Sequence, residues 1–241
     1  MKKSEIAKQF DYKATTFLLT AVIVLTVNSI CGNIVNNFEV PVVLNSVLLA
    51  VVSLCAVFAD IMTIRGFLAV NKSCKLSEDN QNYYMGKKLT VMTVVFIIAG
   101  TILTFIAIAM SVLVEQYNQL ESLTYEDETA RMNMLVLTTI VNIVLQFVAI
   151  STPYIIYVWK LRSVIPAKDK LNNFALITVL VMIVQLAIGI LNSTYIMKNS
   201  DSTFLTAFSE ILSTVKYIVL AVFLFLRRNS IAASMPDEED K

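Results

Sequence analysis

The sequence predicts an all-α integral membrane protein, a bundle of six transmembrane helices with both termini in the cytoplasm. Of its 241 residues, 57% are hydrophobic and 15% are charged, whereas an ordinary soluble domain has about 25% charged residues. Six apolar segments are long enough to cross a bilayer, which takes about 20 helical residues. Because nearly every residue falls in a span or a short connection, we expect residues 1–241 to form a single polytopic membrane domain.

The spans are predicted from uncharged runs of 20 residues or more, together with a last segment that Glu210 and Lys216 interrupt. The fourth span ends in an aromatic cluster, Tyr154, Tyr157 and Trp159, of the kind that marks a membrane interface. If the charges kept the last segment from inserting, five spans would leave the C-terminus outside. The expected spans are about 14–35, 42–64, 89–114, 134–159, 173–196 and 203–226.

Three polar segments lie outside these spans. Residues 1–13 carry four lysines and form either a basic tail that anchors the orientation or a short interfacial helix. Residues 65–88 form the longest connection, and residues 115–131 hold five acidic side chains against a single arginine. Asp60 lies near the end of the second span, where we expect it at the membrane interface and close to Arg65.

The distribution of Lys and Arg predicts the orientation. The two termini and the connections after the second and fourth spans carry 16 of these residues, and the other three connections carry 2. Short connections rich in Lys and Arg stay in the cytoplasm. We therefore expect a multi-pass protein of the cell membrane with cytoplasmic termini and with residues 115–131 outside.

Lys216 is a charged residue close to the middle of the sixth span. Counting back from Arg227 and Arg228, which end that span, places it near the bilayer midplane. A lysine at that depth costs about 2.5–3.5 kcal/mol on insertion scales, so it should face protein or water rather than lipid. Gln146 in the fourth span and Gln185 in the fifth come out at a similar depth. These three residues, Lys216, Gln146 and Gln185, are the candidate midplane polar site.

Other polar residues lie between this depth and the outer surface, while the inner parts of the fifth and sixth spans are almost purely apolar. One interpretation is a polar vestibule that opens to the outside, reaches the midplane and is closed below it. The alternative is that these groups are hydrogen bonds between helices, each worth about 0.6 kcal/mol. The candidate vestibule residues are Asn142, Asn192, Ser209, Ser213 and Glu210.

Several residue types that catalysis requires are missing. The chain has no His, which argues against His-dependent catalysis and His metal sites. It shows no paired Cys or in-membrane cluster of carboxylates that would bind a metal, and no glycine-rich phosphate loop. Cys31, Cys55 and Cys74 fall at different depths and are expected to be free thiols. We therefore expect no enzyme activity, no cofactor, no metal and no nucleic-acid partner.

Two functions fit this architecture. The first is a small transporter or permease-type subunit with an outward-facing polar vestibule. Six spans with cytoplasmic termini and a basic connection are compatible with permease subunits that a separate ATPase drives, and residues 65–88 would then dock that ATPase or another membrane subunit. The second is a membrane-embedded binding or immunity-type protein that engages an extracellular peptide, toxin or small ligand without transport.

Overall fold

A computed structural model describes most of the first half of the bundle and nearly all of the C-terminal part. The described residues are helical apart from the short turns that flank the helices. The long helices are α1 (Lys3–Asn37), α2 (Val42–Leu76), α5 (Thr152–Val164), α6 (Lys170–Ile196) and α7 (Thr203–Ala232). The described residues are 3–37, 41–77, 87–95, 97–99, 151–166, 168–196 and 203–235, with 102, 106, 109, 129, 130, 133, 136 and 137 as single positions.

Four of these helices are long and apolar enough to cross a membrane. The candidate spans are Lys3–Ile34, Ala50–Leu76, Lys170–Asn192 and Phe204–Ala232. They overlap the first, second, fifth and sixth predicted spans, so the all-helical class is confirmed, and the four helices are compatible with a membrane protein. α5 has 13 residues, fewer than the roughly 20 that a span needs. Most of the residues of the third and fourth predicted spans lie outside the described part.

α1 and α2 both extend beyond the predicted first and second spans. α1 begins at Lys3, so the basic N-terminus is neither a tail nor a separate interfacial helix. α2 continues to Leu76, so the first half of the expected connection 65–88 is helical. The reason is that Phe67 and Val70 still pack into the core after Arg65. The charge of Arg65 does not end the helix, because its guanidinium lies over the ring of Phe17, 5.8 Å from its centroid.

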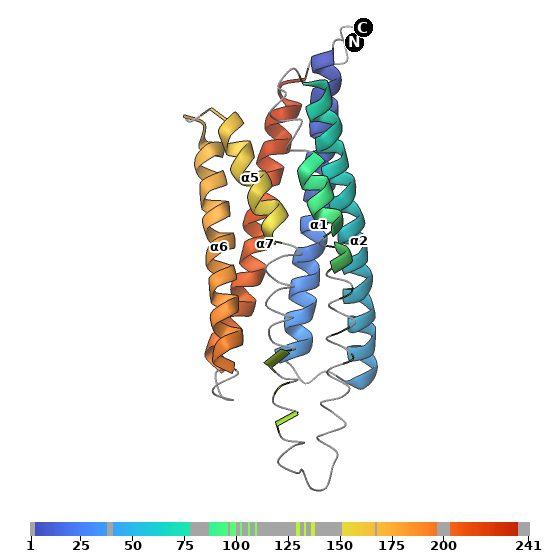
Figure 1. The fold of residues 1–241 in the computed structure, drawn as a ribbon, viewed down its shortest axis with the longest axis vertical. Coiled ribbons are helices and arrows are strands. Elements are labelled where there is room, and N and C mark those ends of the chain that lie inside the picture. Colours follow the sequence, from blue (N-terminus) through green and yellow to red (C-terminus); the bar gives the residue numbers. More distant parts are fainter. Residues whose placement is uncertain are drawn as a thin grey trace.

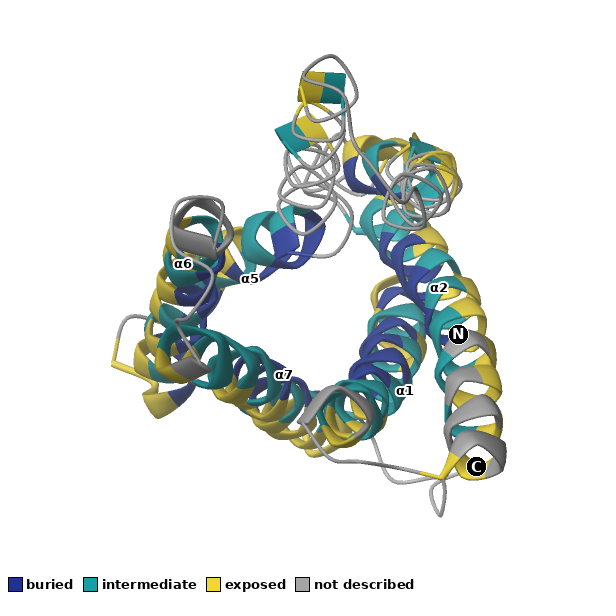
Figure 2. Ribbon diagram, turned by 90° about the horizontal axis from the view of Figure 1, so that it is seen from below, coloured by how far each residue is buried: buried dark blue, intermediate teal, exposed yellow. Residues whose placement is uncertain are grey.

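The helices stand side by side around a ring (Figure 2). α1 packs against α2 and α7, and α6 packs against α7 and α5. α2 and α5 meet where the ring of Phe67 lies 5.8 Å from the rings of both Tyr154 and Tyr157. Both chain ends lie at one end of the bundle, with the end of α2 and the end of α7 (Figure 1). We call this the terminal end.

The outer surface of the bundle is apolar. On α7, exposed side chains recur at steps of three and four residues, which places them on one face of the helix. Buried residues lie mainly on the inner sides of the helices (Figure 2). Such a surface suits lipid as a solvent, since an apolar face this extensive is rare on a soluble monomer. The exposed α7 residues are Ile211, Val215, Ile218, Val222 and Phe225.

Polar contacts join α1 to α7 at the terminal end. The carboxylate of Asp11 accepts a hydrogen bond from Arg227 Nη2 at 2.9 Å, and these two residues form an ion pair. One residue further along each helix, Arg228 Nη2 donates to the hydroxyl of Tyr12 at 2.7 Å. The first and last helices of the chain are therefore held together where both reach the terminal end.

Candidate functional site

Lys216 and Gln185 form a buried polar pair between α7 and α6. Lys216 Nζ donates a hydrogen bond of 3.0 Å to Gln185 Oε1, and each residue is 5% exposed. The ammonium also lies 4.4 Å from the centroid of the Tyr217 ring. The structure thus places Lys216 against protein, as its predicted depth requires. A role of the pair in binding a solute remains a prediction.

In the described part of the chain, the groups that contact the Lys216 ammonium are uncharged. These groups are an amide oxygen and an aromatic ring. An ammonium carries three N–H donors, of which the bond to Gln185 uses one. The arrangement can therefore donate further hydrogen bonds to a polar or anionic group.

Four other predicted site residues, Asn192, Ser209, Ser213 and Glu210, lie on the parts of α6 and α7 that are farther from the terminal end than Lys216. The hydroxyl of Thr206 donates to Asn192 Oδ1 at 3.3 Å, which joins the two helices. Ser209, Ser213 and Glu210 are partly buried on α7. Gln146 and Asn142 lie outside the described residues, so their distance from Lys216 stays a prediction.

Sequence reasoning missed a polar contact between α1 and α7. The hydroxyls of Ser29 and Thr214 are hydrogen-bonded at 2.9 Å, and Asn33 Nδ2 donates to the same Thr214 hydroxyl at 3.2 Å. Thr214 precedes Lys216 by two residues, which is about 3 Å along a helix. Next to Ser29, Asn28 has a buried Oδ1 without a hydrogen-bond partner among the described residues. The four-residue spacing of Ser29 and Asn33 was the signal available in the sequence.

Asp60 has neighbours that the sequence analysis did not predict. No ion pair joins it to Arg65, although both residues are described. Asp60 lies close enough to Tyr154 and Tyr217 to interact with them electrostatically. On the same face of α2, Thr63 shares a hydrogen bond of 2.9 Å with the Tyr154 hydroxyl. The carboxylate therefore belongs to the inner side of the bundle.

An apolar layer separates the Lys216–Gln185 pair from the terminal end. On α7, Leu220, Phe223 and Leu224 follow Lys216 and are fully buried. They pack in one core cluster with Leu18 of α1 and Met182 of α6. The described interior is thus apolar on this side of Lys216, where the sequence predicted closure, and closure itself stays a prediction.

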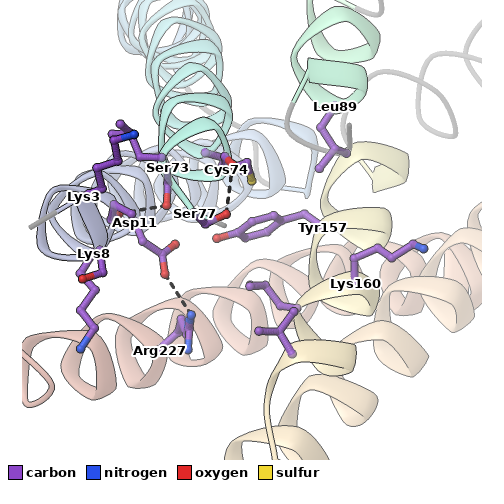
Figure 3. A pocket seen from close by; sticks show the side chains of 16 residues that line it. Lys3, Lys8, Asp11, Ser73, Cys74, Ser77, Leu89, Tyr157, Lys160 and Arg227 are labelled. Carbon is purple, nitrogen blue, oxygen red and sulfur yellow. Dashed lines mark hydrogen bonds and ion pairs between the residues drawn. The ribbon is translucent and has the colours of Figure 1, made fainter. Parts of the chain in front are cut away.

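A cavity of about 710 Å³ lies on the other side of this layer, at the terminal end (Figure 3). The sequence analysis did not anticipate it. Its described lining includes the basic side chains of Lys3, Lys8, Lys160 and Arg227, and the carboxylate of Asp11. Tyr157 reaches into it from α5. The Lys216–Gln185 pair and this cavity are therefore two separate polar regions along the bundle, with the apolar layer between them.

The described residues contain no cluster of three or more His, Cys, Asp or Glu side chains that could hold a metal ion. Cys31, Cys55 and Cys74 are free thiols. Comparisons with protein families, with curated proteins and with solved structures found no match for this chain.

Proposed function

We propose that the protein is a small transporter or permease-type subunit of the cell membrane. In this proposal six helices cross the bilayer, both termini are cytoplasmic, and Lys216 and Gln185 hold a polar solute near the midplane. The observation that carries the proposal is the burial of Lys216 at mid-span with a neutral amide as its hydrogen-bond partner.

Helix packing alone does not account for a buried charge. Polar contacts between membrane helices can be made by Ser, Thr, Asn or Gln at much lower cost, and they contribute about 0.6 kcal/mol each on average. A lysine at mid-membrane costs about 3 kcal/mol on insertion scales. Ionisable residues inside a membrane therefore mark solute or ion pathways more often than they mark packing.

The apolar layer below Lys216 also supports transport. A transporter keeps its site open to one side at a time, and an apolar constriction closes the other side without binding the solute. Here Leu220, Phe223 and Leu224 stand between Lys216 and the cavity at the terminal end. Movement of this layer would connect the two polar regions.

Accessibility of Ser213 from both sides of the membrane tests the proposal. Ser213 lies one turn before Lys216 on α7 and is partly buried. In a variant whose three native cysteines are serine, Ser213→Cys is treated with a membrane-impermeant maleimide in sealed right-side-out and inside-out vesicles, in the presence of ATP. We expect labelling in both orientations, because a transporter exposes its site to each side in turn.

Two matched variants control this experiment. Ile218→Cys lies five residues beyond Ser213 along α7, on the exposed apolar face of that helix, and should stay unlabelled in both orientations. Leu220→Cys lies in the apolar layer and should react far more slowly than Ser213→Cys. Labelling of Ser213→Cys only from outside would favour the membrane-embedded binding protein over the transporter. No labelling from either side would mean that Lys216 and Gln185 serve packing alone.

A further inference from the structure

The cavity at the terminal end has a strong excess of positive charge. Among its described lining residues, Lys3, Lys8, Lys160 and Arg227 are cationic and Asp11 is anionic. The Asp11 carboxylate is bound to Arg227 at 2.9 Å, and Lys8 Nζ donates to a neutral partner, the carbonyl oxygen of Ser234. The lining therefore has three positive charges that its own carboxylate does not balance.

Two buried donors in this lining have no hydrogen-bond partner within the described part of the chain. They are the hydroxyl of Tyr157, a residue that is 4% exposed, and Nε of Arg227. Thr15 is close enough to Tyr157 to interact with it, but the Tyr157 hydroxyl and the Thr15 hydroxyl do not have the geometry of a hydrogen bond, and the Thr15 hydroxyl donates to the carbonyl oxygen of Asp11 at 2.8 Å. Figure 3 shows the Tyr157 ring crossing the cavity from α5, with its hydroxyl directed towards α1 and α2. A buried donor without a partner is costly, so both groups point to a ligand that accepts hydrogen bonds.

The rest of the lining is largely apolar. Val70 and Leu76 of α2, Leu89 of the helical residues 87–95, and Leu161 of α5 contribute to it. A small, fully hydrated anion would gain nothing from these side chains. An amphiphile with an anionic head group would use both parts of the lining.

We propose that this cavity binds the phosphate group of an anionic phospholipid. Tyr157 and Arg227 donate hydrogen bonds to the phosphate oxygens, and the lysines balance its charge. Arg and Lys pair strongly with phosphate oxygens, and basic pockets between membrane helices bind anionic head groups. This inference does not rest on transport, because a static membrane protein could hold the same lipid.

Binding is measured on the purified full-length chain in a neutral detergent. The probe is short-chain phosphatidylglycerol, with short-chain phosphatidylcholine as the neutral comparison and with ATP and inorganic phosphate as soluble sources of the same group. Trp159 is the single tryptophan of the chain and adjoins Lys160, so its fluorescence reports the titration. We expect saturable binding of phosphatidylglycerol that is about tenfold tighter than that of phosphatidylcholine or the soluble phosphates.

Tyr157→Phe is the decisive variant. It removes the hydroxyl without a partner and should weaken phosphatidylglycerol binding about tenfold, as expected for a hydrogen bond to a charged group. The fold should keep or raise its unfolding temperature, because no hydrogen bond is lost. Tyr154→Phe is the matched control: it lies one turn away, is bonded to Thr63 at 2.9 Å and is absent from the cavity lining. It should lower the unfolding temperature and leave lipid binding unchanged.

The outcomes separate clearly. Equal affinity of the wild-type protein for phosphatidylglycerol and phosphatidylcholine would overturn the proposal, and so would unchanged phosphatidylglycerol binding by Tyr157→Phe. If ATP or inorganic phosphate bound more tightly than the lipid, the lipid assignment would be wrong. None of these results depends on the labelling of Ser213→Cys, so the proposal and the transport function can fail independently.

Discussion

Replacing Lys216 and Gln185 by apolar side chains of similar volume, singly and together, tests how the buried pair is stabilised. The variants are Lys216→Met, Gln185→Leu and the double replacement. In the structure each side chain is the hydrogen-bond partner of the other at 3.0 Å, and both are buried. Each single variant therefore leaves one polar group in the bundle without this partner, while the double variant leaves neither.

Three quantities give the expected changes in the free energy of unfolding. An unpaired lysine at mid-membrane costs about 3 kcal/mol. An unpaired buried amide costs about 1.5 kcal/mol, and a hydrogen bond between a charged and a neutral group returns about 2.5 kcal/mol. Gln185→Leu should then destabilise the protein by about 1 kcal/mol, and Lys216→Met should stabilise it by about 0.5 kcal/mol. The double variant should be about 2 kcal/mol more stable than the wild-type protein.

The free energy of unfolding of all four proteins can be measured by steric trapping in bicelles. The coupling between the two changes should be about 2.5 kcal/mol, which is the hydrogen bond itself. Asn192→Leu combined with Lys216→Met is the control, because Asn192 is bonded to Thr206 instead and the two changes should be additive. Additive effects at Lys216 and Gln185, or a double variant less stable than the wild type, would refute this account of the pair.

Two further predictions concern orientation and packing. Two single cysteines in the cysteine-free protein test the orientation: Ser230→Cys, exposed at the terminal end, and Ser122→Cys, in the acidic segment outside the described residues. On intact cells an impermeant maleimide should label only Ser122→Cys. Labelling of Ser230→Cys alone would invert the proposed topology. Gly66→Ala would place a Cβ atom 2.5 Å from Leu18 Cδ2, so we expect a loss of about 1–2 kcal/mol in the free energy of unfolding. Gly32→Ala is the control, because nothing lies within 4 Å of the added carbon, and it should be neutral or stabilising by up to about 1 kcal/mol. Equal changes in the free energy of unfolding at the two glycines would contradict the close approach of α1 and α2.

Depth in the membrane could be predicted from the sequence. The rise of a helix per residue and the thickness of a bilayer are constants, so the position of a residue between two charged boundaries follows by counting. Four predicted spans overlap apolar helices of the structure for this reason. The same count placed Lys216 and Gln185 at one depth, and the structure joins them by a hydrogen bond.

The ends of the helices could not be predicted in the same way. A hydropathy pattern treats every charged residue as solvated, so Arg65 and the N-terminal lysines were taken as the limits of spans. In the structure Arg65 lies over Phe17 and Asp11 pairs with Arg227. These contacts let α1 and α2 continue as helices to the terminal end.

The sequence by itself determined the helical class and the apolar segments that are long enough to cross a membrane. Only the tertiary structure decided which groups meet, because contact also depends on rotation about each helix axis and on which helices are neighbours. Thr214 meets Ser29 across a gap of 185 residues, and Asp60 lies near Tyr154 and Tyr217 of two other helices. The cavity at the terminal end is decided in the same way, since its lining comes from α1, α2, α5 and α7 together.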